Sequence, residues 1–316
     1  MHAPSQFNFF SCDWGTSSFR LRFVWKGRVL EEYRDETGCK LIFEQNSPAN
    51  RPAAFEAQLR RALAKLTRAR GPLPLVISGM ASSTIGWLEL PYTRLPLTLD
   101  GSNLRLERVD WSAPSTISST QLVSGAASEN DMMRGEETEA IGLMQLVSSQ
   151  PPNLLLILPG THSKHLTIQH EKVTAIRTYM TGELYEVLAR HSVLRASVGL
   201  SAELSLPAFS EGVECVRTNG LPASLFQTRT RQVLQGHSPE NNAAFLSGLV
   251  IGAELLALAQ TEGALPIFLG GSGAVRPLYA QAANVLELPL AHIFSDAEMQ
   301  QAVPRAHQLI LSRMPQ

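Results

Sequence analysis

The stretch that most constrains this chain runs from Asp13 to Arg20 and reads DWGTSSFR. An apolar run from Phe7 to Cys12 precedes it and predicts a buried strand. The residues from Phe19 to Trp25 largely alternate between apolar and polar, which is strand periodicity. The stretch is therefore expected to be a tight turn between two antiparallel strands.

This turn contains the groups needed to hold an anion. Gly15 lets the backbone turn where a side chain would clash. The N–H and hydroxyl groups of Thr16, Ser17 and Ser18 are expected to converge on one anion as a backbone nest. Asp13 would repel a phosphate unless a hydrated Mg²⁺ lies between them, so it is expected to bind the metal through water. The plainer alternative is a hairpin whose Asp and Ser side chains form local turn hydrogen bonds.

Bulk composition narrows the class of protein. A length of 316 residues predicts about two domains, and 44% hydrophobic with 17% charged residues is typical of a globular protein. A net charge of −1 gives no basic surplus for nucleic acid or an anionic membrane. The three cysteines lack metal-ligand spacing and fit reduced thiols. We expect no signal peptide, no apolar run long enough to span a bilayer, and a cytoplasmic location.

The chain divides at Pro151-Pro152-Asn153, which predicts domains 1–150 and 151–316 of the α/β class. Each half opens with a strand, a Gly-Thr turn and a returning strand, which indicates an internal duplication. Further strands are expected at 28–33, 73–77, 117–123, 173–180 and 266–269, and helices at 52–69, 136–147, 182–191, 240–260, 275–284 and 297–312. Residues 38–50 are expected to be a polar connection, and 200–238 short helices and loops. Gly248 and Gly252 predict close helix packing.

The counterpart of the first turn in the second half runs from Gly160 to Lys164, with Thr161, His162 and Ser163 between them. Its backbone N–H groups and hydroxyls would neutralise developing charge without moving. Lys164 is expected to place a point charge on a phosphate or on an acceptor carboxylate. His162, His165 and His170 do not have metal-ligand spacing. An ordinary loop glycine is the alternative.

A second glycine-rich stretch, Gly270-Gly271-Ser272-Gly273, follows a predicted strand and precedes a helix. Glycines there let a flat base and ribose approach the backbone. The spacing is not that of a dinucleotide-binding fingerprint, and no P-loop occurs in the chain. A plain strand-to-helix turn is the alternative.

Three acids surround Arg134 just before the helix at 136: Asp131, Glu136 and Glu137. A carboxylate there can take the proton of a hydroxyl as a phosphoryl bond forms. Asp131 and Glu136 are the candidate bases, with a slight preference for Asp131. Acids in a first helical turn also cap the helix, which is an equal alternative. The guanidinium of Arg134 suits a planar carboxylate on a ligand, because it can donate two parallel hydrogen bonds.

A ligand pocket is expected where a predicted strand of the first half ends. The candidate lining residues are Ser78, Gly79, Met80, Ser82, Trp87 and Tyr92. An aromatic face would lie against sugar carbons, although Trp87 is as readily a core residue. Thr181 is expected to cap the helix that follows it.

Five stretches in this order resemble the 2-dehydro-3-deoxygalactonokinase family of the sugar kinase, Hsp70 and actin superfamily. After the Asp13–Arg20 turn they are Ser78–Trp87, Met133–Thr138, Pro159–Lys164 and Met180–Leu184, with Phe245–Gly248 following. The resemblance implies two ribonuclease H-like domains of the actin-like ATPase fold, an interdomain cleft, and a last helix that returns to the first domain. It also implies that ATP·Mg²⁺ lies against the two turns and the Gly270–Gly273 stretch, with Arg20 on a phosphate.

The implied reaction is phosphorylation of 2-dehydro-3-deoxy-D-galactonate on its terminal (6-) hydroxyl in galactonate catabolism. A kinase for another keto-deoxy acid or an amino sugar is one alternative. A sugar-sensing regulator or a chaperone-like ATPase is another, but the sequence is expected to lack both a DNA-binding segment and a peptide-binding domain. For the oligomeric state, a homodimer is the assembly that we consider.

Overall fold

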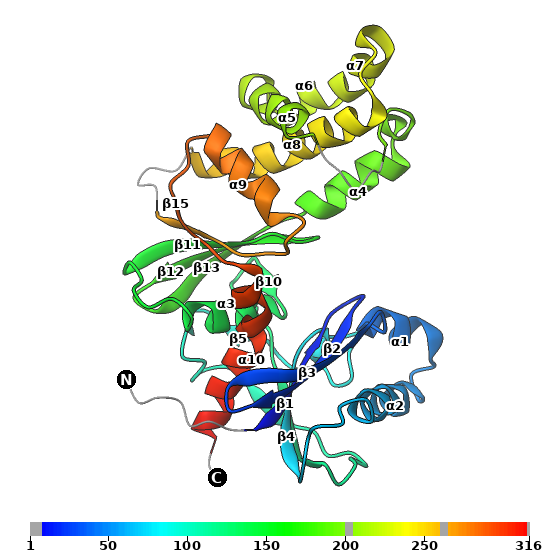
Figure 1. The fold of residues 1–316 in the computed structure, drawn as a ribbon, viewed down its shortest axis with the longest axis vertical. Helices are drawn as coiled ribbons and strands as arrows, with labels where there is room; N and C mark the ends of the chain where they lie inside the picture. The colour runs from blue at the N-terminus through cyan, green and yellow to red at the C-terminus, as the bar shows by residue number, and fades with distance from the viewer. Residues whose placement is uncertain (1–7, 200–204, 260–264, 315–316) are drawn as a thin grey trace. The chain divides into compact units, whose positions relative to one another are not determined.

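The computed structural model describes residues 8–199, 205–259 and 265–314. Three predicted features therefore lie partly outside the described residues: the strand start at Phe7, residues 200–204 of the 200–238 segment, and the helix end at Gln260. The chain forms two compact units (Figure 1). Unit 1 comprises Met1–Pro152, Ile168–Ile176 and Ala297–Gln316, and unit 2 comprises Asn153–Thr167 and Arg177–Asp296.

Unit 1 is built on a mixed sheet with the strand order β3-β2-β1-β4-β8-β7. The strands are β1 (Phe9–Trp14), β2 (Phe19–Trp25), β3 (Arg28–Asp35), β4 (Leu73–Gly79), β7 (Leu106–Arg108) and β8 (Ile117–Val123). β1 pairs antiparallel with β2 and parallel with β4, and β4 pairs parallel with β8. The strands predicted at 28–33, 73–77 and 117–123 are confirmed, because apolar alternation and short buried runs are strong local signals.

One face of this sheet is covered by α1 (Cys39–Gln45) and α2 (Arg51–Leu63) (Figure 1). Cys12 and Trp14 of β1 point to this face and share a core cluster with Phe55 and Leu59 of α2. Two predictions are wrong here. Residues 39–45 are helical rather than a polar connection, and α2 ends at Leu63 instead of continuing to residue 69.

The opposite face carries Ser11 and Asp13, because side chains alternate along a strand. The helices α3 (Glu136–Met144) and α10 (Asp296–Arg313) belong here. Ser11 Oγ lies 2.8 Å from Nδ1 of the buried His307 of α10. Burial, with the nearby charge of Arg22, lowers the pKa of His307 to about 3, so its imidazole is neutral at physiological pH.

Three short strands of unit 1 form a small separate sheet: β5 (Thr93–Arg94), β9 (Ala126–Ala127) and β10 (Met132–Met133). β9 and β10 pair antiparallel, which makes residues 128–131 the loop of a hairpin. Segments of two residues leave no periodicity to detect, so this sheet has no signal in the sequence.

The sheet of unit 2 has β11 (Asn153–Leu158), β12 (Ser163–Gln169), β13 (Lys172–Tyr179), β14 (Ile267–Leu269) and β15 (Leu290–Ile293), in the order β15-β14-β11-β12-β13. β11 pairs parallel with β14, and β14 with β15. Residues 168–176, at the far end of the β12–β13 hairpin, belong to unit 1, where Val173 pairs with Leu97 of β6 (Leu97–Thr98).

The two sheets share one strand order. β3-β2-β1-β4-β8 in unit 1 corresponds to β13-β12-β11-β14-β15 in unit 2. The first three strands of each set are consecutive in the chain, and the fourth lies beside the first. The structure therefore confirms the internal duplication that was expected from the two similar openings.

The helices of unit 2 are α4 (Thr181–His191), α5 (Leu206–Asn219), α6 (Leu221–Leu225), α7 (Gln227–Gln235), α8 (Pro239–Ala259) and α9 (Arg276–Val285). α5 and α8 lie side by side (Figure 1), and their glycines allow backbone contact. A Cβ atom on Gly248 would lie 2.0 Å from the carbonyl oxygen of Phe209, and one on Gly212 would lie 2.2 Å from that of Phe245. The predicted close packing at Gly248 is confirmed.

By length and composition α8 meets the criterion for a membrane span over Pro239–Leu258, with a mean hydropathy of 1.4. The expectation that no apolar run is long enough is therefore wrong for this helix. However, 72% of that window is buried inside the protein. Packing in the core of unit 2, chiefly against α5, accounts for the apolar composition.

Candidate active site

The first predicted site lies where β1 ends. β1 continues to Trp14, so Asp13 is a strand residue rather than part of the turn. Asp13 is half-buried and stands opposite Arg20 of β2 and Ser78 of β4 in the strand registers. The turn covers Gly15 to Ser18 and is closed by a 2.8 Å hydrogen bond from the Gly15 N–H to the Ser18 carbonyl.

The hydroxyl residues of this turn face solvent. Thr16, Ser17 and Ser18 are exposed. Their hydroxyls make no hydrogen bond within the part of the chain that the structure describes. A Cβ atom on Gly15 would meet only the end of the Ser18 side chain, at 3.1 Å, so the clash expected there is small.

The glycine that this turn requires is Gly38, which the sequence analysis did not single out. A Cβ atom on Gly38 would lie 2.2 Å from the Thr16 carbonyl oxygen and 2.5 Å from Ser17 backbone atoms. The next two residues start α1, and their N–H groups donate to the turn: Cys39 to the Gly15 carbonyl at 3.0 Å and Lys40 to the Thr16 carbonyl at 3.1 Å. These bonds satisfy N–H groups that a helix start leaves open.

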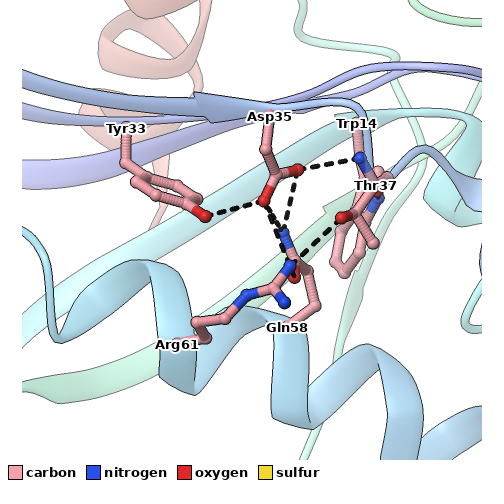
Figure 2. A network of polar contacts seen from close by, with 6 residues as sticks. All are labelled: Trp14, Tyr33, Asp35, Thr37, Gln58 and Arg61. Carbon is pink, nitrogen blue, oxygen red and sulfur yellow. Dashed lines mark hydrogen bonds and ion pairs between the residues drawn. The ribbon is translucent and has the colours of Figure 1, made fainter.

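A polar network fixes the segment that leads to Gly38 (Figure 2). The carboxylate of Asp35 accepts hydrogen bonds from the Tyr33 hydroxyl, the Thr37 N–H, and the side chains of Gln58 and Arg61. Trp14 donates from Nε1 to the Thr37 carbonyl at 3.0 Å. The turn after β1 is thus supported by β3, α2 and the start of α1.

The ends of β1 and β4 and the start of α3 meet closely. Gly79 has φ 91°, and a Cβ atom there would lie 2.7 Å from the Trp14 carbonyl oxygen. Gly135 has φ 109° and faces the Cα of Gly79. Only glycine tolerates these conformations readily. Ser78, which is fully buried between them, has no hydrogen-bond partner for its hydroxyl among the described residues.

The acids at the start of α3 lie in this neighbourhood. Glu136 accepts a 2.9 Å hydrogen bond from the Arg134 N–H, and Glu137 accepts from the Gly135 N–H at 2.8 Å. Burial, with the charge of Glu136, raises the pKa of Glu137 to about 8. Burial also raises the pKa of Glu139 to about 8, and the charges of Asp13 and Glu136 add to this effect. Asp13, Glu136 and Glu139 therefore share one electrostatic environment.

Asp131 lies elsewhere on unit 1, in the loop of the β9–β10 hairpin. Its carboxylate accepts a 2.7 Å hydrogen bond from the neighbouring Met132 N–H. Its backbone N–H bonds to Ser128 Oγ at 3.0 Å. These are local turn contacts, whereas Glu136 belongs to a helix start beside Gly79. The structure thus places the two candidate bases on different elements.

Arg134 is heavily engaged within the protein. Nη1 donates to the Ser82 carbonyl and hydroxyl oxygens at 2.5 and 2.6 Å, and Nη2 donates to the Leu90 carbonyl at 3.3 Å. Its guanidinium also stacks on Tyr92, with Cζ 4.2 Å from the ring centroid. These contacts use much of the donor capacity that was expected to bind a substrate carboxylate. Through these hydrogen bonds and the stacking contact, Arg134 stabilises the conformation of the segment from Ser82 to Tyr92.

Trp87 packs against the core on the α2 side of the sheet, with its ring in edge contact with Trp111 at 5.7 Å. Met80 also packs against that core. Asp13 points to the opposite face, so the structure supports the core alternative for Trp87. Ser82, by contrast, is held next to Gly79 and Arg134.

In unit 2, the turn between β11 and β12 consists of Pro159 to His162, because β12 already begins at Ser163. Gly160, Thr161 and His162 are exposed, whereas Ser163 and Lys164 are buried. Lys164 points to the face of β12 opposite Ser163, as strand alternation requires. The structure therefore separates Lys164 from the hydroxyl of Ser163.

The N-terminus of α4 is in close contact with this turn. A Cβ atom on Gly182 would lie 2.6 Å from the Gly160 carbonyl oxygen, and Glu183 donates from its N–H to the Thr161 carbonyl at 3.1 Å. His162 Nε2 and Glu183 Oε2 lie 2.5 Å apart at the surface. The expected cap at Thr181 is wrong, because Met180 occupies the N-cap position and the Thr181 hydroxyl is directed elsewhere.

The Gly270–Gly273 stretch lies beside the same turn. Gly271 has φ 94°, and a Cβ atom there would lie 2.9 Å from Cδ of Pro159. Gly270 donates from its N–H to the Ile157 carbonyl at 2.9 Å. Arg276 holds the loop by donating to the Gly271 carbonyl at 2.8 Å and to Asp296 at 2.6 Å. The two glycine-containing stretches of unit 2 thus form one surface.

The residues present fit a metal held mainly by water and ligand oxygens. Within residues 8–199, 205–259 and 265–314 there is no group of three His, Cys, Asp or Glu side chains that could hold an ion. Asp13 is a half-buried carboxylate next to exposed hydroxyls. Mg²⁺ keeps several waters and is bound through one or two carboxylates plus phosphates, which matches this sparse arrangement.

Comparison with known proteins identifies the class. The family model for 2-keto-3-deoxy-galactonokinase matches residues 13–305. The Rhizobium meliloti (strain 1021) protein named probable 2-dehydro-3-deoxygalactonokinase DgoK1 is 31% identical over 94% of this chain and 96% of its own length. The 2-dehydro-3-deoxygalactonokinase of Escherichia coli (strain K12) is 28% identical over 93% of this chain and 96% of its own. The chain is thus a sugar-acid kinase, which is a phosphotransferase.

Solved structures are also similar to this chain. The crystal structure of a candidate 2-dehydro-3-deoxygalactonokinase from Sinorhizobium meliloti has a TM-score of 0.79 and 28% identity, and covers 96% of this chain and 97% of that one. Component A of the Acidaminococcus fermentans (R)-2-hydroxyglutaryl-CoA dehydratase shares the fold alone, with a TM-score of 0.51, 9% identity, and coverage of 98% and 100%. The chain belongs to the 2-keto-3-deoxy-galactonokinase family.

Proposed function

We propose that this chain transfers the γ-phosphoryl group of ATP to the terminal (6-) hydroxyl of 2-dehydro-3-deoxy-D-galactonate, in galactonate catabolism in the cytoplasm. The observation that carries this proposal is the family match from residue 13 to 305, which includes every candidate site residue. Both curated relatives are named for this acceptor and align with nearly the whole chain. The alternative acceptors and the non-catalytic regulator have no comparable support.

Both units are proposed to be ribonuclease H-like domains of the actin-like ATPase fold. The shared strand order and the parallel pairing of the fourth strand with the first support this assignment. In such a fold the phosphate-binding turn follows the first strand of each domain, as the resemblance implies. The domain boundary proposed at 150/151 is close to the division between Pro152 and Asn153.

The nucleotide is proposed to bind to three stretches: Gly15–Ser18 with Arg20, Gly160–His162, and Gly270–Gly273. The exposed hydroxyls of the first turn and the exposed backbone of the second are free to donate to phosphate oxygens. Rigid donors of this kind stabilise the charge that develops during transfer without having to reorganise. In the glycine loop beside Pro159, the exposed residues Ser272 and Gly273 are the ones proposed to contact the adenosine.

Asp13 is proposed to hold Mg²⁺ through water. When bound, this ion neutralises phosphate charge and screens Asp13 from the phosphates. The protein positions the carboxylate for this by placing it in a strand between Arg20 and Ser78.

Glu136 is proposed as the base in preference to Asp131. It begins a helix beside Gly79, and its charge acts on the same group as that of Asp13. As the new O–P bond forms, the carboxylate takes the proton of the attacking hydroxyl, and ADP leaves on the opposite side of the phosphorus. Asp131 is the rival, on the hairpin loop.

The acceptor is proposed to contact Ser78, Gly79 and Ser82 at the end of β4, and Lys164 to supply positive charge. Met80 is left out because it packs against the core on the α2 side of the sheet. Ser78 has an unpartnered buried hydroxyl that is available to a ligand. Arg134 supports this site mainly by fixing Ser82. Trp87 is left out of the site because its packing accounts for its position.

A coupled ADP-release assay tests the function. The purified chain is supplied with MgATP and, separately, with 2-dehydro-3-deoxy-D-galactonate, other keto-deoxy acids, hexoses and amino sugars. We expect turnover with the first of these acids and a kcat/KM at least tenfold lower for the others. Absence of turnover with every sugar acid would remove the assignment.

Two isosteric variants separate the candidate bases. Glu136→Gln should lower kcat by about 10²–10⁴-fold, the range for loss of a general base, with ADP affinity preserved. Asp131→Asn should keep most of the turnover. If Asp131→Asn loses turnover and Glu136→Gln keeps it, the base is Asp131 on the hairpin loop. If both variants keep full turnover, neither residue is the base.

A further inference from the structure

After Glu240 in its first turn, the apolar helix α8 contains one further acid, Glu254, which is 3% exposed. Its two oxygens accept hydrogen bonds from four side chains. Oε1 is bound by Ser163 Oγ and His165 Nε2, each at 2.7 Å. Oε2 is bound by the hydroxyls of Tyr279, at 2.6 Å, and Thr181. A buried carboxylate requires such compensation, since an unpaired one would cost several kcal/mol.

The four donors come from three elements besides α8. Ser163 and His165 lie on β12, Thr181 begins α4, and Tyr279 lies on α9. Burial and the charge of Glu254 both raise the pKa of the Tyr279 hydroxyl, so it stays protonated and acts as a donor. The carboxylate is therefore a junction where β12, α4, α8 and α9 are tied together.

Two of these donors border the proposed phosphate-binding surface of unit 2. Ser163 directly follows His162, the last residue of the exposed turn. Thr181 directly precedes Gly182, which contacts the Gly160 carbonyl oxygen so closely that a Cβ atom would lie 2.6 Å from it. The turn and the N-terminus of α4 thus each have one anchor on the same carboxylate.

We propose that Glu254 is a positioning residue that holds the Pro159–His162 turn and the start of α4 in the geometry that binds the phosphate groups of the nucleotide. Glu254 acts through its hydrogen bonds to Ser163 and Thr181, and it does not contact the ligand. This inference rests on the proposed nucleotide site, but not on the identity of the acceptor.

The main test is Glu254→Gln. One oxygen of the side chain becomes an amide that must face two donors, so at least one of the four hydrogen bonds is lost. We expect the Kd for Mg·ADP, measured by calorimetry without acceptor, to rise at least tenfold. In turnover, the KM for ATP should rise similarly while the KM for the sugar acid changes less than twofold.

A matched pair of variants separates positioning from general stability. Thr181→Val and Tyr279→Phe each remove one hydroxyl from the same oxygen of Glu254. Thr181 is on the turn side and Tyr279 on the α9 side. We expect Thr181→Val to weaken Mg·ADP at least fivefold and Tyr279→Phe less than twofold. Ser224→Ala, which removes a buried hydrogen bond in α6, is the stability control and should leave the Kd unchanged.

The outcomes are distinct. If Glu254→Gln or Thr181→Val melts at a lower temperature but binds Mg·ADP like the wild type, the positioning role is overturned. If Glu254→Gln does not fold, a larger loss of Mg·ADP affinity in Thr181→Val than in Tyr279→Phe supports the positioning role, and an equal or smaller loss overturns it. A wild type that binds Mg·ADP but phosphorylates no sugar acid refutes the proposed function and leaves this inference standing. A wild type that binds no nucleotide refutes both.

Discussion

Single residues decide the shape of the first turn, and the most demanding is Gly38. It has no side chain to separate the start of α1 from the turn backbone at Thr16 and Ser17. The N–H groups of the next two residues bind that backbone as well. A glycine more than twenty positions away therefore controls the proposed phosphate-binding hydroxyls.

Gly38→Ala tests this dependence. The new methyl group would overlap the Thr16 carbonyl, at 2.2 Å, so the turn or α1 must move. We expect the KM for ATP to rise at least tenfold and the free energy of unfolding to fall by about 2–4 kcal/mol. Gly71→Ala is the control: it has no atom within 4 Å and only its φ of 75° is strained, at about 1–2 kcal/mol. Equal ATP kinetics in both variants would contradict the role of Gly38.

The ionisation of Glu137 makes the free energy of unfolding depend on pH. Its pKa is about 8 in the folded chain and 4.5 when unperturbed. Between these values the folded state holds a proton that the unfolded state has lost. The free energy of unfolding therefore falls as pH rises through this window, and the loss is complete above pH 8. Below the ordinary pKa the stabilisation is fully present.

Glu137→Gln cannot ionise and should not show this loss. Between pH 5 and pH 8.5, the free energy of unfolding of the variant should gain about 2–4 kcal/mol relative to the wild type. Urea denaturation at a series of pH values measures the difference. The exposed Asp110→Asn should follow the wild-type curve, and a Glu137→Gln curve parallel to the wild type would refute the raised pKa.

Whether the role of such a residue could be predicted from the sequence depends on how far away in the chain its contact partners lie. Asp13, the three hydroxyls and the glycines at 160 and 271 were found because they sit together in short stretches. Gly38 and Glu254 were missed, since their contacts come from distant parts of the chain. Glu254 did leave one signal: it is an acid in the apolar interior of a long helix, which predicts buried hydrogen-bond partners.

Among the elements, α8 shows how two glycines four positions apart act differently. A Cβ atom on Gly248 would meet the backbone oxygen of Phe209 at 2.0 Å. On Gly252 the nearest atom is the end of the Val216 side chain, at 2.8 Å, which can rotate. The closeness of α5 and α8 is thus set mainly at Gly248.

The matched substitutions should therefore diverge. Gly248→Ala must push α5 and α8 apart, and we expect a loss of about 3 kcal/mol or more in the free energy of unfolding of unit 2. Gly252→Ala should cost less than about 1.5 kcal/mol, because the helix propensity of alanine offsets the repacking. Chemical denaturation followed by far-UV circular dichroism measures both. Equal losses would show that α5 adjusts easily.

Elements with strong periodicity were predictable, and those defined by distant contacts were not. β11 is a short apolar run with clear boundaries, and the strand that opens the second half is found where the sequence predicts it. β8 is more polar, but it also has the predicted bounds, 117–123. α1 has no side-chain cap, and its first N–H groups donate to the carbonyls of Gly15 and Thr16. No local sequence signal therefore marks where this helix begins. The hairpin that carries Asp131 is built from two-residue strands, which leave no periodicity in the sequence, so it was not predicted.

On the scale of the whole molecule, one strand order is used twice, and each copy places a turn after its first strand. Each turn is also held by a carboxylate from within its own unit, Asp35 in unit 1 and Glu254 in unit 2. The repeated opening was visible in the sequence, whereas these two supports were not. They have no sequence similarity to each other and lie at unrelated positions in the chain.

Unit 1 is completed by the final helix. Residues from Ala297 onward belong to it, His307 of α10 bonds to Ser11 of β1, and Gly142 of α3 lies directly against the backbone of Ala302. During translation, β1 therefore leaves the ribosome almost three hundred residues before the helix that covers it. Until then that surface of unit 1 lacks its covering helix, and we expect nascent chains to need chaperone protection there throughout the synthesis of unit 2.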